Sequence, residues 1–478
     1  MENSVREFVI LGQQKNKIMF SKETYLNRRK NLTMNFTDGI LLFLGNIENP
    51  RNFALNQYPF RQDSNFLYYF GIQEPRIAAI IDINEDKTIV FGDELTVDDI
   101  VWMGQLETLH HKAERSGVTE TRPYQQLFDY VKKAKSGQRK VHYLPPYQSA
   151  NKILLSELLD CPISAFQPSE SFITSIISQR SHKEAQELEE IEKAVNVSNQ
   201  MHLAVMKMAR PGVKEYELVA EMLKIAQSNN QEFSYPSIMT INGQTLHNHD
   251  HSNTLKSGQL LLNDSGSEST MGYAGDLTRS FPVDVKFTTK QREIYDIVLD
   301  THMMVANTIK PGIRYKDVHL MAARIIATGL TNLGLMKGNP EEAVAAGAHA
   351  LFFPHGLGHM MGLDVHDMED LGEINVGFTK DDPKDLETFG LNALRLGRKL
   401  EPGFVLTDEP GIYFIPELVE MWEKEQKFTQ FINYAKVHEY LDFGGIRIED
   451  NFVITETGGR KLGEYLIKTA DEIEAYRS

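Results

Sequence analysis

Residues 201–214 read MHLAVMKMARPGVK, and the same pattern returns one hundred positions later (301 − 201) as THMMVANTIKPGIR at residues 301–314. In each copy an amphipathic stretch ends at a basic-Pro-Gly stop, because proline cannot continue a helix and glycine accepts the left-handed turn that ends one. A second helical pattern follows, over 216–226 and 317–333. The match predicts two similar halves related by a pseudo-twofold axis, with a site at their junction. A chance match between two common helix stops is the alternative.

Two carboxylates follow the first helix pair, each in a short stretch typical of a buried strand. Asp264 ends the apolar run LLLNDSG at 260–266, and Asp276 lies in YAGDLTRSFP at 273–282, which a proline closes. These patterns predict a strand at both places. A strand is stiff enough to hold a metal ligand in position.

Two more carboxylates follow the second helix pair. Glu409 lies in FVLTDEPG at 404–411, and GGIRIED at 444–450 alternates so that Arg447 and Glu449 share one face of a strand. A single Asp or Glu is usually solvated or a helix cap, and four independent core salt bridges are the alternative explanation. A buried carboxylate costs several kcal/mol unless it is paired, so four of them favour a shared partner.

A histidine-rich segment adds nitrogen ligands. PHGLGHMMGLDVHD at 354–367 contains His355, His359 and His366, three of the chain's 15 histidines. His355 and His366 are either site residues or hydrogen-bonded core histidines. Four carboxylates carry about four negative charges, which two divalent cations would neutralise. Oxygen ligands with one imidazole suit Mn²⁺ first, with Co²⁺, Fe²⁺ or Zn²⁺ as alternatives. The predicted metal ligands are Asp264, Asp276, His359, Glu409 and Glu449.

Four motifs carry a resemblance to a known family: PHGLGH at 354–359, GLDVHD at 362–367, TDEPGIY at 407–413 and GIRIED at 445–450. Through them, residues 176–478 resemble the catalytic domain of the Xaa-Pro peptidases, aminopeptidase P and prolidase. The resemblance implies an α+β pita-bread fold with a pseudo-twofold repeat, in which the five predicted ligands hold two metal ions. It also implies further site residues, namely His247, His366 and Arg447 around the substrate and His355 lining the pocket.

The N-terminal part contains QYPFRQDSNFLYYFG at 57–71 and VWMG at 101–104, which resemble the accessory domain of the same family. Its own pattern predicts a smaller α/β domain of alternating strands and helices, with a hairpin formed by 77–83 and 87–92. The expected domains are 1–175 and 176–478.

Composition narrows the function classes. The net charge of −16, from 50 basic and 66 acidic residues, argues against a nucleic-acid binder, which needs a basic face. The lone Cys161 excludes an internal disulfide and points to a reducing compartment. Residues 1–7 lack an apolar signal core, and the chain has no run of about 18 apolar residues. We therefore expect a cytoplasmic protein without a membrane partner.

The ligand set and the resemblance together predict a hydrolase. Two metals bridged by Asp276 and Glu449 would activate a water, so no nucleophilic side chain is needed. Glu409 is the expected general base, His366 the group that stabilises the oxyanion, and His247 a candidate proton shuttle. The requirement for proline at the second position of the peptide substrate comes from the resemblance alone.

Related functions remain in competition. We expect an Xaa-Pro aminopeptidase, with Xaa-Pro dipeptidase (prolidase) as the alternative because Arg395 matches an arginine that captures a dipeptide carboxylate. A surface helix arginine is an equal interpretation of Arg395. A creatinase-like enzyme without metals, or a non-catalytic pita-bread binding protein, would lack ligands that are all present here. The predicted assembly is a homodimer or larger homo-oligomer.

Overall fold

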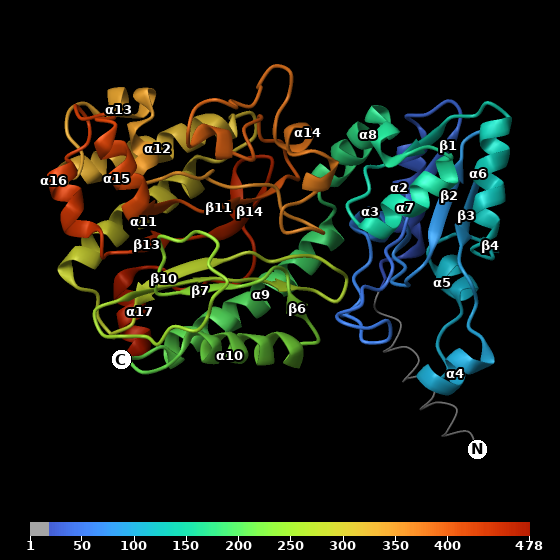
Figure 1. The fold of residues 1–478 in the computed structure, drawn as a ribbon, viewed down its shortest axis with the longest axis horizontal. Helices are drawn as coiled ribbons and strands as arrows, with labels where there is room; N and C mark the ends of the chain where they lie inside the picture. Colours follow the sequence, from blue (N-terminus) through green and yellow to red (C-terminus); the bar gives the residue numbers. More distant parts are fainter. Residues whose placement is uncertain (1–18) are drawn as a thin grey trace. The chain divides into compact units, whose positions relative to one another are not determined.

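The computed structural model describes residues 19–478, and the chain divides into two compact units between Arg180 and Ser181 (Figure 1). The division lies at the end of helix α8 (Glu170–Ser181), whereas the boundary expected near 175 falls inside it. In the described part of the chain, no helix is both long and apolar enough to cross a bilayer.

A five-stranded mixed sheet forms the centre of the first unit, in the order β4-β3-β2-β1-β5. The predicted hairpin is confirmed, because β2 and β3 pair antiparallel with Asp82 opposite Lys87. The edge strands β5 and β4 pair in parallel with β1 and β3. The strands are β1 (Ile40–Leu44), β2 (Ala78–Asp82), β3 (Lys87–Phe91), β4 (Glu120–Arg122) and β5 (Val141–Tyr143).

Helices cover this sheet because alternate strand residues turn an apolar face toward them. Leu42, Ile80 and Phe91 are fully buried and pack with Leu127 and Val131 of α6. The helices of the unit before α8 are α2 (Lys22–Thr33), α3 (Ser64–Phe70), α4 (Val97–Met103), α5 (Leu109–Arg115), α6 (Gln126–Ser136) and α7 (Ser149–Leu159).

Two helix pairs in the second unit confirm the repeated pattern seen in the sequence. Both long helices stop just before their Pro-Gly pair, with Ala209 and Ile309 in extended conformation. Gly212 and Gly312 then take φ values of 93° and 83°, which side chains other than glycine rarely adopt. The first pair runs side by side along the sheet that contains β7 (Ile238–Thr240) and β10 (Thr278–Pro282) (Figure 1). The pairs are α9 (Ala185–Met208) with α10 (Glu215–Ser228), and α11 (Thr289–Thr308) with α12 (Tyr315–Asn332).

Small sheets carry the carboxylate-bearing segments. Strand β8 lies between β7 and β10, and its last residue, Asp264, is opposite Thr278. Strand β11 pairs antiparallel with β14, which places Asp408 opposite Asp450. The strands are β6 (Glu232–Phe233), β7 (Ile238–Thr240), β8 (Leu260–Asp264), β9 (Ser267–Glu268), β10 (Thr278–Pro282), β11 (Val405–Asp408), β12 (Gly411–Tyr413), β13 (Gly445–Arg447), β14 (Asp450–Ile454) and β15 (Gly459–Lys461).

Three of the four carboxylates lie outside the strands: Glu409 directly follows β11, and the other two are Asp276 and Glu449. Asp276 precedes β10, and its backbone is held by Asn451, which accepts from the Asp276 amide at 3.1 Å and donates to its carbonyl at 2.6 Å. Glu449 lies between β13 and β14, where an isolated bridge pairs it with Thr278. Side-chain hydrogen bonds and a single bridge therefore replace the regular ladder at these two positions.

The remaining helices of the second unit lie later in the chain, and residues 379–387 contain neither helix nor strand. These helices are α13 (Pro340–Ala346), α14 (Glu373–Gly377), α15 (Pro416–Lys424), α16 (Tyr434–Val437) and α17 (Ala470–Arg477).

Candidate metal centre

A cavity of about 450 Å³ in the second unit gathers the side chains that the sequence singled out. A volume of this size suits a small ligand or the end of a peptide. Every predicted site residue lines it: Asp264, Asp276, His359, Glu409, Glu449, His247, His355, His366, Arg395 and Arg447.

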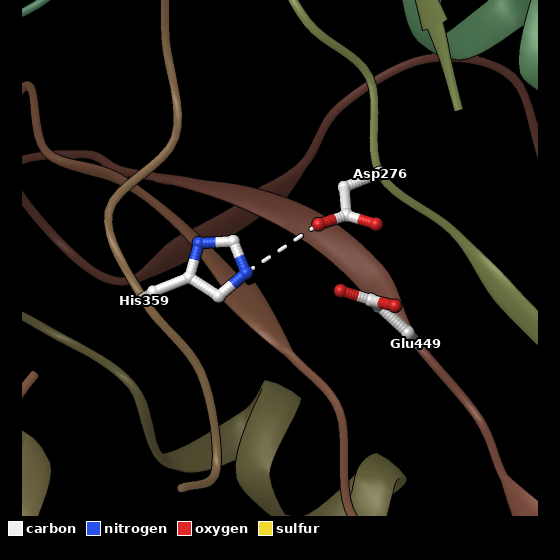
Figure 2. A group of neighbouring side chains, drawn as sticks. All are labelled: Asp276, His359 and Glu449. Carbon is white, nitrogen blue, oxygen red and sulfur yellow. Dashed lines mark ion pairs between the residues drawn. The ribbon is translucent and has the colours of Figure 1, made fainter. Parts of the chain in front are cut away.

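Three of these residues form a group compact enough to hold one ion. One ligand atom each from Asp276, His359 and Glu449 lies within 4.8 Å of the others, and all three side chains are buried. Figure 2 shows the imidazole and both carboxylates turned toward a common space, with His359 Nε2 3.4 Å from Asp276 Oδ2. His359 Nδ1 donates to the Met360 carbonyl at 3.0 Å, so the neutral ring keeps a lone pair on Nε2 for a ligand.

The fourth and fifth predicted ligands lie at the edges of this group. Glu409 Oε1 is 3.7 Å from His359 Nε2. Asp264 is joined to Asp276 by the hydroxyl of Tyr235, which lies 2.6 Å from Asp264 Oδ1 and 2.5 Å from Asp276 Oδ1. Sequence reasoning missed Tyr235, and nothing in its local pattern distinguishes it from other tyrosines.

The pKa values of the clustered side chains show that positive charge would stabilise this site. Burial, reinforced by repulsion from the neighbouring carboxylates, raises the pKa of Glu449 well above its usual value. Burial also raises the pKa of Glu409 to about 7 and raises that of Asp264 despite the nearby Arg447. Burial alone would lower the pKa of His359, but the carboxylates raise it to about 9.

These residues fit divalent cations. Glu449 Oε2 accepts from Thr278 Oγ1 at 2.7 Å, whereas its Oε1 has no hydrogen-bond partner within the described residues. An orphaned, buried carboxylate oxygen surrounded by other carboxylates is costly unless a cation neutralises it. The donor set of carboxylate oxygens and one imidazole is the kind that Mn²⁺, Co²⁺, Fe²⁺ and Zn²⁺ accept.

Arg447 connects a carboxylate of the site to Tyr413 and, through it, to His355. Its guanidinium forms an ion pair with Asp264 and donates to the Tyr413 hydroxyl at 2.7 Å. His355 Nε2 lies 2.9 Å from the same hydroxyl, and His355 Nδ1 lies 2.7 Å from the Gly356 carbonyl. Burial lowers the pKa of His355 to about 3, so this ring is neutral. Tyr413 belongs to the TDEPGIY motif but was not singled out from the sequence.

His366 stacks on His359, with ring centroids 3.9 Å apart. Its Nδ1 donates to Glu369 at 3.0 Å, since a carboxylate can only accept. Glu369 also accepts from Arg395 at 2.6 Å, and these partners outweigh burial and lower the pKa of Glu369 to about 2. Glu369 was not predicted, although an acidic residue three positions after a site histidine is a visible signal.

Two family models match the chain. The model described as Aminopeptidase P, N-terminal domain matches residues 25–143, and the model of Metallopeptidase family M24 matches residues 189–456, more than half of the chain. The chain belongs to metallopeptidase family M24. It is therefore a metal-dependent hydrolase, and divalent metal ions are its implied cofactor.

Relatives agree over nearly the full length of this M24 enzyme. It is 32% identical to Xaa-Pro dipeptidase of Homo sapiens, covering 87% of the chain and 84% of the relative. It is 31% identical to Xaa-Pro aminopeptidase of Escherichia coli (strain K12), covering 95% and 97%. Solved structures of E. coli aminopeptidase P, one zinc-substituted with product and one with the inhibitor Pro-Leu, match with a TM-score of 0.78 at 29% identity, over 96% of this chain and 98% of theirs. The predicted α+β pita-bread fold is thereby confirmed.

Proposed function

We propose that this M24 enzyme is an Xaa-Pro aminopeptidase, which releases the N-terminal residue from peptides with proline in the second position. The observation that carries the proposal is the convergence of four carboxylates and His359 in one buried cavity. The match of residues 25–143 to the aminopeptidase P N-terminal domain favours this activity over that of a dipeptidase. The E. coli relative that matches over 95% of the chain is named for the same activity.

We assign two divalent ions to the cavity, Mn²⁺ first and Co²⁺, Fe²⁺ or Zn²⁺ as alternatives. Asp276 and Glu449 would be shared between the two ions, and both belong to the compact group with His359. When bound, such ions supply an acidified water as nucleophile and a Lewis acid for the scissile carbonyl. The complete ligand set is Asp264, Asp276, His359, Glu409 and Glu449.

Proton transfer falls to side chains of the cavity. Glu409 acts as general base, because its carboxylate faces the compact group and a pKa raised by burial suits proton uptake near neutral pH. His247 lines the same cavity, and burial followed by the charge of Arg447 lowers its pKa, so it is neutral and able to relay a proton.

His366 is the proposed donor to the scissile carbonyl oxygen. Because its Nδ1 donates to Glu369, its Nε2 donates only when the ring is protonated. Burial lowers the pKa of His366. Negative charge that develops on the carbonyl oxygen would raise this pKa. The oxyanion role therefore requires His366 in its protonated form, which the charge developing on the carbonyl oxygen favours. Arg447 and His355 line the cavity as substrate-binding residues.

Prolidase activity is the alternative, and one observation favours it. Arg395 lines the cavity, where its guanidinium could bind the carboxylate of a dipeptide. The human relative at 32% identity is named an Xaa-Pro dipeptidase.

A substrate comparison tests the proposal. The protein, supplied with Mn²⁺, is assayed on an Xaa-Pro dipeptide and on Xaa-Pro-Yaa peptides of the same N-terminal residue. A higher kcat/KM on the longer peptides is expected. Cleavage restricted to the dipeptide would establish a prolidase, and no cleavage of either would refute both.

Further assignments belong to the same proposal. We assign residues 1–175 to the accessory domain and 176–478 to the catalytic domain. The lone Cys161 supports a reducing, cytoplasmic location. A homodimer or larger homo-oligomer is the proposed assembly, which light scattering of the purified protein tests directly.

A further inference from the structure

The two long helices of the repeat each present a buried histidine at the same place. His202 in α9 and His302 in α11 are one hundred positions apart (302 − 202), and both are 0% exposed. Neither is among the residues that line the cavity. A buried imidazole needs polar partners, and the partners of each of these rings lie next to a carboxylate of the metal centre.

His302 bridges two carboxylates that face each other across the β11–β14 ladder. Its Nε2 forms a hydrogen bond of 3.1 Å with Asp450 Oδ2, and its Nδ1 lies at ion-pair distance, 2.9 Å, from Asp408 Oδ2. Like charges directly opposite in an antiparallel pair destabilise it, so the imidazole between them joins the strands. Asp408 immediately precedes Glu409, and Asp450 immediately follows Glu449. Successive residues of an extended chain face opposite sides, so these contacts on the helix side turn Glu409 and Glu449 toward the cavity.

His202 makes the corresponding contacts in the first half. Its Nε2 is 3.1 Å from the Ser265 carbonyl, and its Nδ1 is 3.1 Å from Asn263 Nδ2. These two residues flank Asp264. Because the Asn263 amide donates, Nδ1 accepts and Nε2 carries the proton, so the ring is neutral. Burial lowers the pKa of His202 to about 4, in agreement with that state.

The two halves share this geometry but differ in charge. Asn263 precedes one site carboxylate where Asp408 precedes another, so an amide in the first half matches a carboxylate in the second. Asp450 has two additional cations, Arg279 at 2.8 Å and Lys468. Among the residues that the structure describes, His302 is the one basic group within ion-pair distance of Asp408. Asp408 therefore has fewer close cationic partners than Asp450.

We propose that His202 and His302 are positioning residues, which hold the carboxylates of the metal centre in place from the side of the helices. His202 orients Asp264 through Asn263 and Ser265, and His302 orients Glu409 and Glu449 through the two aspartates. The inference rests on the proposed metal-dependent function, and it accounts for the place of the histidine within the repeated helix.

Metal affinity is the decisive measurement. Mn²⁺ is titrated by calorimetry into the metal-free full-length protein and its His302→Gln and His202→Gln variants. The matched control is His438→Gln, which alters an exposed histidine paired with Glu423 at 2.7 Å. Loss of a partner that orients metal ligands weakens binding by about 10–100-fold. We expect a dissociation constant raised by that factor in the His202→Gln and His302→Gln variants and unchanged in the control.

The alternatives give different results. If a variant has a lower melting temperature but the wild-type dissociation constant for Mn²⁺, that histidine is merely structural and the proposal is overturned. If His302→Gln does not fold, Asp408→Asn replaces it, because asparagine already occupies the matching position 263; weaker Mn²⁺ binding then supports the proposal and unchanged binding overturns it. Wild-type protein that binds no Mn²⁺ would instead refute the proposed function itself.

Discussion

Arg395 donates a hydrogen bond of 2.6 Å to Glu369, the same carboxylate that accepts from His366 Nδ1 at 3.0 Å. An arginine expected to bind substrate thus also supports the carboxylate that orients a proposed catalytic histidine. A guanidinium has five N–H donors, so one side of Arg395 can hold Glu369 while another faces the cavity. Substitutions at these positions separate the two roles.

Arg395→Ala distinguishes the aminopeptidase from the dipeptidase. If Arg395 binds the dipeptide carboxylate, the variant loses kcat/KM on Xaa-Pro more than on Xaa-Pro-Yaa. The difference corresponds to about 2–3 kcal/mol of transition-state stabilisation, the contribution of a charged hydrogen-bonded pair. Arg460→Ala, which removes an exposed arginine paired with Glu192, is the control. Equal losses on the two substrates would show that Arg395 acts only through Glu369 and would remove the argument for prolidase.

Glu449→Ala is expected to abolish nearly all activity and to reduce the bound metal below the two ions expected for the wild type. The reason is that Glu449 belongs to the compact ligand group with Asp276 and His359 and would be shared by both ions in the proposed mechanism. Elemental analysis and peptide hydrolysis measure the two effects, with Glu456→Ala at an exposed position as control. A variant with normal turnover, or a wild type with one ion, would contradict the two-metal mechanism.

His366→Ala should fold, retain its metal ions and lose kcat by about a hundredfold or more, the usual cost of removing an oxyanion donor. Steady-state kinetics with elemental analysis check this, and His438→Ala serves as an exposed control. A change in KM alone would identify His366 as a binding residue.

Glu369→Gln should destabilise the metal-free protein in a pH-dependent way. The pKa of Glu369 is about 2 in the folded protein and 4.5 in the unperturbed group. A depressed folded pKa means that the carboxylate stabilises fully above pH 4.5, and that this contribution disappears as pH falls toward 2. Urea unfolding at pH 6 and pH 3 should therefore show that the difference between wild type and variant shrinks by more than half. A constant difference would show that Glu369 contributes through packing alone.

Much of the site could be predicted from sequence because its signals are local. The Pro-Gly helix stops at 211–212 and 311–312, the apolar run before Asp264, and the glycine-spaced histidines each follow from neighbouring residues. The chemistry of the ligands follows from residue type, because a buried carboxylate needs a partner wherever the chain places it.

The tertiary structure alone decided what depends on residues far apart in the chain. The position of Asp276 outside β10 rests on Asn451, and the link between Asp264 and Asp276 rests on Tyr235. The contacts of His302 with Asp408 and Asp450 form only when folding brings helix α11 against strands β11 and β14. Such contacts have no fixed spacing in sequence, because a hydrogen bond depends on distance and direction in space, and packing of the whole unit determines both.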